Sequence, residues 1–152
     1  MSLMDKISNQ AAYTQVRMNI TGTDGIGKST FGAGAPKPIF ICAEDGLRFI
    51  DIPHFPVCET YNDIMEQVKT LSTEGHNFKT VVLDTTDFAE RLCQEQVKES
   101  HNIQTIEALG YGKGFTESYE LFARILRNLE ALSVAKKMNI ILLSHVQIRT
   151  FS

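Results

Sequence analysis

Four short apolar runs divide the chain, and the segments between them carry the spacing of amphipathic helices. The runs span residues 16–21, 39–43, 80–84 and 138–143. Residues 39–43 are five apolar residues in a row, which is typical of a strand buried on both faces of a parallel sheet. The run at 16–21 alternates instead between apolar and polar residues. We therefore predict a strand at each of the four runs.

Helical spacing predicts helices in the segments between these strands. In the helix expected over residues 60–73, Thr60 and Asp63 resemble a capping pair, and Gly75 is expected to end the helix. Further helices are expected over residues 28–33, 87–100 and 115–135. The apolar face of the last one would consist of Phe115, Tyr119, Phe122, Ile125, Leu126, Leu129 and Leu132. Strands that alternate with helices in this way predict a doubly wound, three-layer α/β fold with a mostly parallel sheet.

Composition restricts the possible functions. The chain has 152 residues, of which 43% are hydrophobic and 22% charged, as expected for one globular domain. Its net charge of −3 provides no general basic surface, so any nucleic-acid site must be local. No apolar run approaches the roughly 20 residues of a membrane span, and no signal peptide is visible. Residues 1–3, ahead of Met4, resemble a vector-derived start, so we take residues 4–152 as the domain.

Cysteine and histidine are few and widely spaced, with no C-x-x-C pair. This spacing supports neither a zinc site nor a disulfide framework. A reducing, cytoplasmic setting fits these residues, which are Cys42, Cys58, Cys93, His54, His76, His101 and His145.

A glycine-rich stretch follows the first predicted strand and reads Gly-Thr-Asp-Gly-Ile-Gly-Lys-Ser over residues 22–29. It fits G-x-x-x-x-G-K-[ST] at every fixed position, with a strand before it and a helix after it. Glycines let successive backbone N–H groups point at one anion, and the positive end of the helix faces the same point. The residues expected to bind the phosphates of a nucleotide are Gly22, Thr23, Asp24, Gly25, Ile26, Gly27, Lys28, Ser29 and Thr30. The alternative is a glycine-rich turn with a surface lysine.

Two of these residues have specific expected roles. Lys28 would place its charge on the β- and γ-phosphates, and the Ser29 hydroxyl would bind Mg²⁺. The absence of an Asn-Lys-x-Asp guanine-reading motif from the sequence favours ATP over GTP.

The other predicted strands also end in residues that carry chemistry, and ligands of open parallel sheets bind at the carboxyl ends of the strands. Asp84 closes its strand in the manner of a Walker B carboxylate, which would hold Mg²⁺ or orient Ser29. The alternatives are a helix N-cap or a surface acid. Glu44, at the end of the second strand, is the candidate general base, because Thr85 and Thr86 rather than a glutamate follow Asp84.

The remaining candidates leave alternatives open. Asp45 is the rival of Glu44 as base, and either could instead be a solvated turn acid. His145 ends the fourth strand and would contact the γ-phosphate, as Gln147 also could. A histidine packed at the edge of the core explains His145 equally well.

Residues 110–114 form a glycine-rich loop with Lys113 and Tyr111, followed by Phe115. Flexible backbone, a cation and stacking rings suit single-stranded nucleic acid. The alternative is that the rings dock on the core. Lys113 and Arg149 could otherwise act in trans across a subunit boundary.

The order of these motifs resembles that of RecA-like recombinase cores. The matching runs are Gly22 to Thr30, Ile41-Cys42-Ala43-Glu44, Val81-Val82-Leu83-Asp84-Thr85 and Leu142-Leu143-Ser144-His145. RecA-like ATPases carry their catalytic glutamate at the end of the strand after the P-loop helix, where Glu44 stands. The chain is most similar to phage-encoded RecA-like proteins of the AAA type. That similarity is carried by Gly27 to Pro36, Gly110 to Gly114 and Ser144 to Ile148.

The resemblance implies an ATPase with Mg²⁺ that works as a homo-oligomer in phage DNA recombination or single-strand annealing. It also implies that the His145 strand lies between the P-loop strand and the Asp84 strand, with the Glu44 strand at the outer edge. Family members continue beyond the Ser-His-x-Gln-Ile run with further strands, whereas this chain ends at Ser152. We therefore expect a longer natural protein, and a P-loop strand left at the sheet edge.

Two other functions remain open at this point. A small nucleotide kinase also begins with a P-loop, but it needs an Arg-rich lid, and residues 110–129 offer only Lys113, Arg124 and Arg127. A nucleotide-dependent binding module would use the same cradle without hydrolysis.

Overall fold

In the part of the chain that the structure describes, the sheet is four-stranded and all its strands are parallel. The computed structural model describes residues 1–11, 14–44, 50–146 and 150. The strands are β1 (Arg17–Gly22), β2 (Pro38–Cys42), β3 (Thr80–Asp84) and β4 (Asn139–His145), in the order β1-β4-β3-β2. The four predicted strands and the order that the resemblance implied are confirmed. All four carboxyl ends therefore meet at one edge of the sheet.

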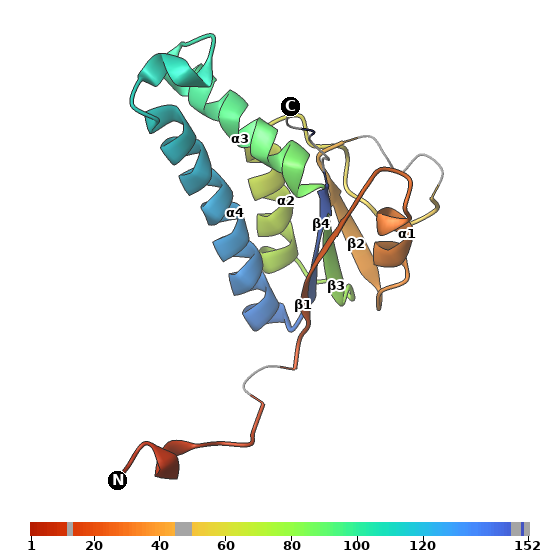
Figure 1. Ribbon diagram of the computed structural model, residues 1–152. Coiled ribbons are helices and arrows are strands. Elements are labelled where there is room, and N and C mark those ends of the chain that lie inside the picture. The colour runs from red at the N-terminus through yellow and green to blue at the C-terminus, as the bar shows by residue number, and fades with distance from the viewer. Residues whose placement is uncertain (12–13, 45–49, 147–149, 151–152) are drawn as a thin grey trace.

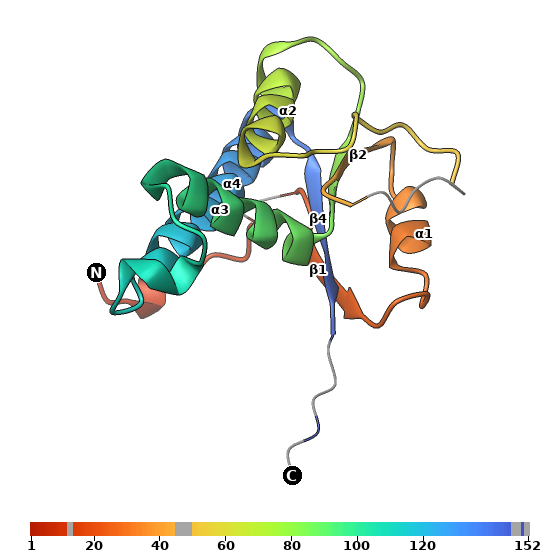
Figure 2. The same ribbon diagram turned by 90° about the horizontal axis from the view of Figure 1, so that it is seen from above.

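Helices cover both faces of the sheet and give three layers (Figures 1 and 2). The short α1 (Lys28–Ala33) lies on one face. The other face carries α2 (Tyr61–Thr73), α3 (Thr86–His101) and α4 (Lys113–Lys136). Two 3₁₀ segments, η1 (Met4–Lys6) and η2 (Ile106–Leu109), complete the described elements. The predicted three-layer α/β fold is confirmed.

The two faces bury very different amounts of apolar surface. Successive strand residues alternate between faces, so Ile41 and Leu83 meet the three helices while Phe40 and Val82 meet the side of α1. The core beneath the three helices includes Ile64, Ile125, Leu129, Leu132 and Met138, all almost fully buried. The α1 side has a smaller cluster of Phe40, Cys42, Val82, Ile141 and Leu143.

Helix α2 begins as the sequence predicts. Thr60 Oγ1 accepts from the Asp63 N–H at 3.1 Å, and Asp63 Oδ2 accepts from the Thr60 N–H at 3.0 Å. An aspartate thus completes a capping box that usually uses Glu or Gln. The helix ends at Thr73, where Glu74 is already extended, so it ends before it reaches Gly75.

Helix α4 differs from its prediction at its start. The helix begins at Lys113, so the predicted 110–114 loop is two residues too long. Phe115 and Tyr119, which were expected on the buried face, are 48% and 72% exposed. Gly114 is buried in their place, and a Cβ atom there would lie 2.2 Å from the Ile106 carbonyl oxygen. Because α4 approaches η2 through Gly114 and the buried Ser118, the neighbouring rings turn outward.

At the strand starts, neutral side chains link the strands. The buried Thr80 hydroxyl donates to the Pro36 carbonyl at 2.8 Å and accepts from Asn139 Nδ2 at 3.3 Å. Asn139 Oδ1 accepts from the Val16 N–H at 2.9 Å, which ties the segment before β1 to β4. Arg17 of β1 pairs with Glu130 of α4 through two nitrogens. The edge strand β1 is thereby anchored at its beginning.

Candidate functional site

The glycine-rich stretch forms a loop between the end of β1 and the start of α1 (Figure 2). Gly25 and Gly27 have φ values of 76° and 99°, which glycine adopts without steric cost. Lys28, which is 8% exposed, donates from Nζ to the carbonyls of Gly22 and Thr23, both at 2.9 Å. The loop therefore wraps around a buried lysine, and a surface-lysine turn is excluded.

Ser29 and Asp84 meet across the gap between α1 and β3. The Ser29 hydroxyl donates to Asp84 Oδ2 at 2.6 Å. Burial raises the pKa of Asp84, against the lowering effect of the Ser29 hydrogen bond and of the charges on His145 and Lys28. Thr85, not Asp84, is the N-cap residue of α3, so the N-cap alternative for Asp84 is wrong. A hydroxyl and a carboxylate supply the oxygen ligands that Mg²⁺ prefers.

Glu44 lies two residues beyond β2, with a side chain that is 24% exposed. Burial raises the pKa of Glu44, as does the charge of Asp84, while His145 lowers it. A raised pKa brings a carboxyl closer to the range in which a general base works well. Glu44, Asp84 and Lys28 line the same hollow of about 370 Å³.

The His145 ring lies among the carboxyl groups of Asp24, Glu44 and Asp87. Its Nε2 lies 2.7 Å from Asp24 Oδ1 of the loop and 3.8 Å from Glu44 Oε1. Its Nδ1 lies 3.3 Å from Asp87 Oδ2, and its side chain is 20% exposed. The ring is partly packed, edge-on to Phe88, yet it also faces the hollow. Packing at the edge of the core therefore describes part of the surroundings of His145, and its contact with the γ-phosphate stays a prediction.

The structure brings most of the predicted residues together. The hollow is lined by Asp24, Gly25, Gly27, Lys28, Ser29, Thr30, Glu44, Asp84, Thr85 and His145. Gly22 contributes the carbonyl that holds Lys28, whereas Ile26 is 67% exposed. Asp45, Gln147 and Arg149 lie outside the described residues, as does part of the Ser144 to Ile148 run.

Two residues of this region were not predicted. Thr85 lines the hollow and is 1% exposed. Asp87 contacts His145, although its position in the first turn of α3 suggests only a favourable interaction with the helix dipole. The only signal for Thr85 was its place directly after Asp84. The spacing of Asp87 gave no signal, since its partner lies 58 residues away.

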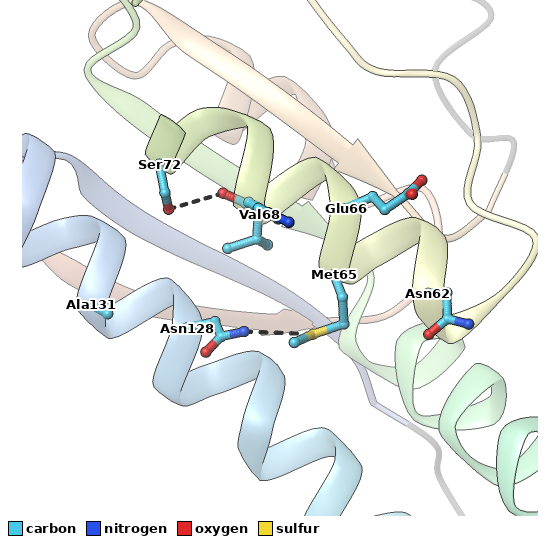
Figure 3. Close-up of a pocket in the computed structure, with 8 residues that line it drawn as sticks. Asn62, Met65, Glu66, Val68, Ser72, Asn128 and Ala131 are labelled. Carbon is cyan, nitrogen blue, oxygen red and sulfur yellow. Dashed lines mark hydrogen bonds between the residues drawn. The ribbon is translucent and has the colours of Figure 1, made fainter. Parts of the chain in front are cut away.

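Other parts of the described chain do not gather comparable chemistry. A groove of about 550 Å³ between α2 and α4 is lined by Asn62, Met65, Val68 and Asn128, among others (Figure 3). Its Asn128 amide lies against the Met65 sulfur at 3.9 Å. Burial raises the pKa of the Cys58 and Cys93 thiols to about 12, which makes both poor nucleophiles. Within the described residues, no three His, Cys, Asp or Glu side chains converge as a metal site.

The turn at residues 110–112 lies at the far end of the α3–α4 pair from the sheet (Figure 1). Tyr111 is fully exposed and Phe115 is half exposed, so the interpretation that these rings dock on the core is wrong. Tyr111 adopts a φ of 50° between two glycines that also have positive φ. Such a conformation is uncommon for a residue with a side chain.

Comparison with known protein families assigns most of the chain to a described family. A family model described as "AAA domain" matches residues 14–152, which include β1, the glycine-rich loop and every residue that lines the hollow. Comparison with curated proteins gives no match. None of the described helices is long and apolar enough to cross a membrane.

Proposed function

The chain belongs to the AAA domain family, whose members are expected to bind nucleotides, and on this premise we propose that it binds ATP with Mg²⁺ and hydrolyses it. One observation carries the proposal. A lysine, a hydroxyl–carboxylate pair, a second carboxylate and an imidazole surround one hollow at the carboxyl ends of the strands. A lysine on the phosphates, a hydroxyl and a carboxylate for Mg²⁺, and a further residue that positions the attacking water are the parts that recur in NTP hydrolysis.

The loop residues Gly22 to Thr30 would hold the phosphates, with Lys28 exchanging its two carbonyl partners for phosphate oxygens. Ser29 and Asp84 would hold Mg²⁺, which neutralises charge on the phosphate oxygens when bound. The fit rests on the 2.6 Å contact between two hard oxygen donors.

Glu44 is proposed as the general base. It would accept a proton from the attacking water as the water oxygen bonds to the γ-phosphorus and the bond to the β–γ bridging oxygen breaks. Its raised pKa and its place on the hollow beside Asp84 support this role. His145 would contact the γ-phosphate through Nε2, and Gln147 is a further proposed contact of the nucleotide.

Steady-state ATP hydrolysis with Glu44→Gln tests the proposal. We expect turnover to fall by about 10²–10⁴-fold, as for loss of a general base, with ATP affinity retained. Glu120→Gln, which changes an exposed acid on α4, is the matched control and should hydrolyse ATP normally. Unchanged turnover in Glu44→Gln would show that Glu44 is not the base.

The same assay separates the alternatives. A binding module without hydrolysis would bind ATP tightly and release no phosphate. A nucleotide kinase would transfer the phosphate to a nucleoside monophosphate rather than to water, so an acceptor screen distinguishes it.

The wider role we propose is that of a RecA-like ATPase, encoded by a phage and acting as a homo-oligomer in recombination or annealing, in the cytoplasm of the host. Residues 4–152 would belong to its single ATPase domain. The exposed Tyr111 and Phe115 support a local single-stranded DNA site, because bases stack on accessible rings. Stimulation of ATP hydrolysis by single-stranded DNA, and its loss in a Tyr111→Ser/Phe115→Ser variant, would support this role. Absence of stimulation would leave only a general ATPase.

A further inference from the structure

Asp87 belongs to the first turn of α3, yet it forms its contacts with the end of β4 rather than with its own helix. Its Oδ2 atom accepts a hydrogen bond from the His145 main-chain N–H at 2.6 Å. The same oxygen lies 3.3 Å from Nδ1 of the His145 ring. One carboxylate oxygen therefore contacts both the backbone and the side chain of a single residue.

Both contacts act on the orientation of the imidazole. The main-chain bond fixes the last residue of β4 against α3, and hydrogen bonds to a carboxylate are roughly twice as strong as those between neutral groups. The contact at Nδ1 limits rotation of the ring, and it directs the opposite nitrogen, Nε2, toward Asp24 and Glu44. A ring nitrogen bound in this way commonly sets what the other nitrogen can do.

The next residues of α3 complete the support. The Phe88 ring packs edge-on against His145, with ring centroids 6.3 Å apart. Arg91 lies over Phe88 at 4.6 Å from the ring centroid, one turn further along the helix. The His145 ring is thus held by a carboxylate and an aromatic ring from one helix turn, while the groups at Nε2 come from two other segments.

We propose that Asp87 is a positioning residue, which holds His145 so that Nε2 faces Glu44 and the glycine-rich loop. The consequence for catalysis rests on the proposed ATPase function, whereas the hold on His145 does not. Asp87 would touch neither the nucleotide nor the attacking water, and it would act only through His145.

NMR of the ¹⁵N-labelled protein tests the hold directly. In Asp87→Ala we expect the His145 amide proton to move upfield, because it loses a short bond to a carboxylate, and both imidazole ¹⁵N shifts to change. In Asp87→Asn the amide oxygen can still accept from the main chain, so the amide proton should move less while the ring shifts still change. Glu90→Gln, an equal loss of charge on an exposed position of α3, should leave His145 unaffected.

Kinetics test the consequence. Misplaced catalytic groups cost up to about 10²-fold in rate, so we expect Asp87→Ala to lower kcat by about 10–10²-fold with KM near the wild-type value. Asp87→Asn should recover part of the loss. Unchanged His145 shifts in Asp87→Ala would overturn the proposal, as would a variant whose KM rises while kcat is kept. If the wild-type protein hydrolyses no ATP, the proposed function fails, and the NMR shifts still decide whether Asp87 positions His145.

Discussion

The two ends of the sheet both bury polar side chains, but they do so in opposite ways. At the strand starts, Thr80 and Asn139 are neutral and bond to each other, to Pro36 and to Val16. At the carboxyl ends, Glu44 and Asp84 are acids whose pKa values burial raises. A buried neutral group with its hydrogen bonds made stabilises a fold, whereas a partly desolvated charge costs free energy. The contrast suggests that the polar groups at the strand starts stabilise the sheet, whereas the acids at the carboxyl ends have a chemical role.

Among the changes that test this contrast between the two ends of the sheet, the largest effect is expected from Lys28, at the carboxyl ends of the strands. Lys28→Ala should lower ATP turnover by about 10²–10³-fold, the usual cost of one lost donor to a developing charge. Lys79→Ala, at the opposite end of the sheet, is the control and should retain wild-type turnover. ATP hydrolysis under saturating and limiting ATP measures both. Equal losses in the two variants would remove the distinction between the ends.

Thr80→Val tests the strand starts, where neutral side chains make the hydrogen bonds. The change keeps shape but deletes a hydroxyl that is fully buried and bonded to Pro36 and Asn139, so we expect a loss of about 1–3 kcal/mol in the free energy of unfolding. Urea denaturation measures the loss. Thr73→Val removes an exposed hydroxyl bonded within its own helix and should change stability by less than about 0.5 kcal/mol. An equally small effect of Thr80→Val would contradict the structural role of this end.

Ser144→Ala tests whether the effect of a polar side chain on stability depends on its position in the sheet or on its charge. Ser144 lies at the carboxyl ends of the strands, but its hydroxyl joins a neutral chain, donating to Asn19 Oδ1 at 3.0 Å and lying 2.7 Å from the Thr86 hydroxyl. If charge decides, the variant should lose about 0.5–1.5 kcal/mol in the free energy of unfolding, because the Ser144 hydroxyl, like that of Thr80, makes neutral hydrogen bonds. Thermal unfolding measures this. A gain in stability would show that polar side chains at the carboxyl ends of the strands are destabilising even when they are neutral.

The smallest effect is expected on stability, from Glu44→Gln, and it depends on pH. Burial raises the pKa of Glu44 in the folded state above its value in the unfolded chain. At a pH between these two pKa values, the folded protein therefore holds a proton on Glu44 that the unfolded chain has lost. The free energy of unfolding should therefore fall as pH rises through this window, and the full cost is present at neutral pH. We expect Glu44→Gln to raise Tm slightly at pH 7, with the gain shrinking toward acid pH. A lower Tm at pH 7 would contradict this sign.

The sequence predicted the parts of the molecule that depend on neighbours along the chain. Residues 39–43 predicted a strand because they are continuously apolar, and the glycine-rich stretch predicted its loop because its spacing is fixed by backbone geometry. The meeting of Ser29 with Asp84 followed from one rule, that parallel strands end at the same edge.

The parts that were missed depend on packing between distant segments. The rings of Phe115 and Tyr119 have helical spacing, but the tight contact of Gly114 with Ile106 decides which side of α4 is buried. Asp87 has the position of a residue that begins a helix, and only the alignment of α3 with β4 turns it toward His145. Neither contact leaves a periodic pattern in the sequence.

The strand order has a consequence for synthesis of the protein. In the described sheet the neighbour of β1 is β4, and the bond between Val16 and Asn139 joins residues 123 positions apart. During synthesis on the ribosome, β1 can pair with β4 only after nearly all of the described chain has emerged. Pairing over such distances is slow to form, so the proposed nucleotide site is completed late, after β4 has emerged.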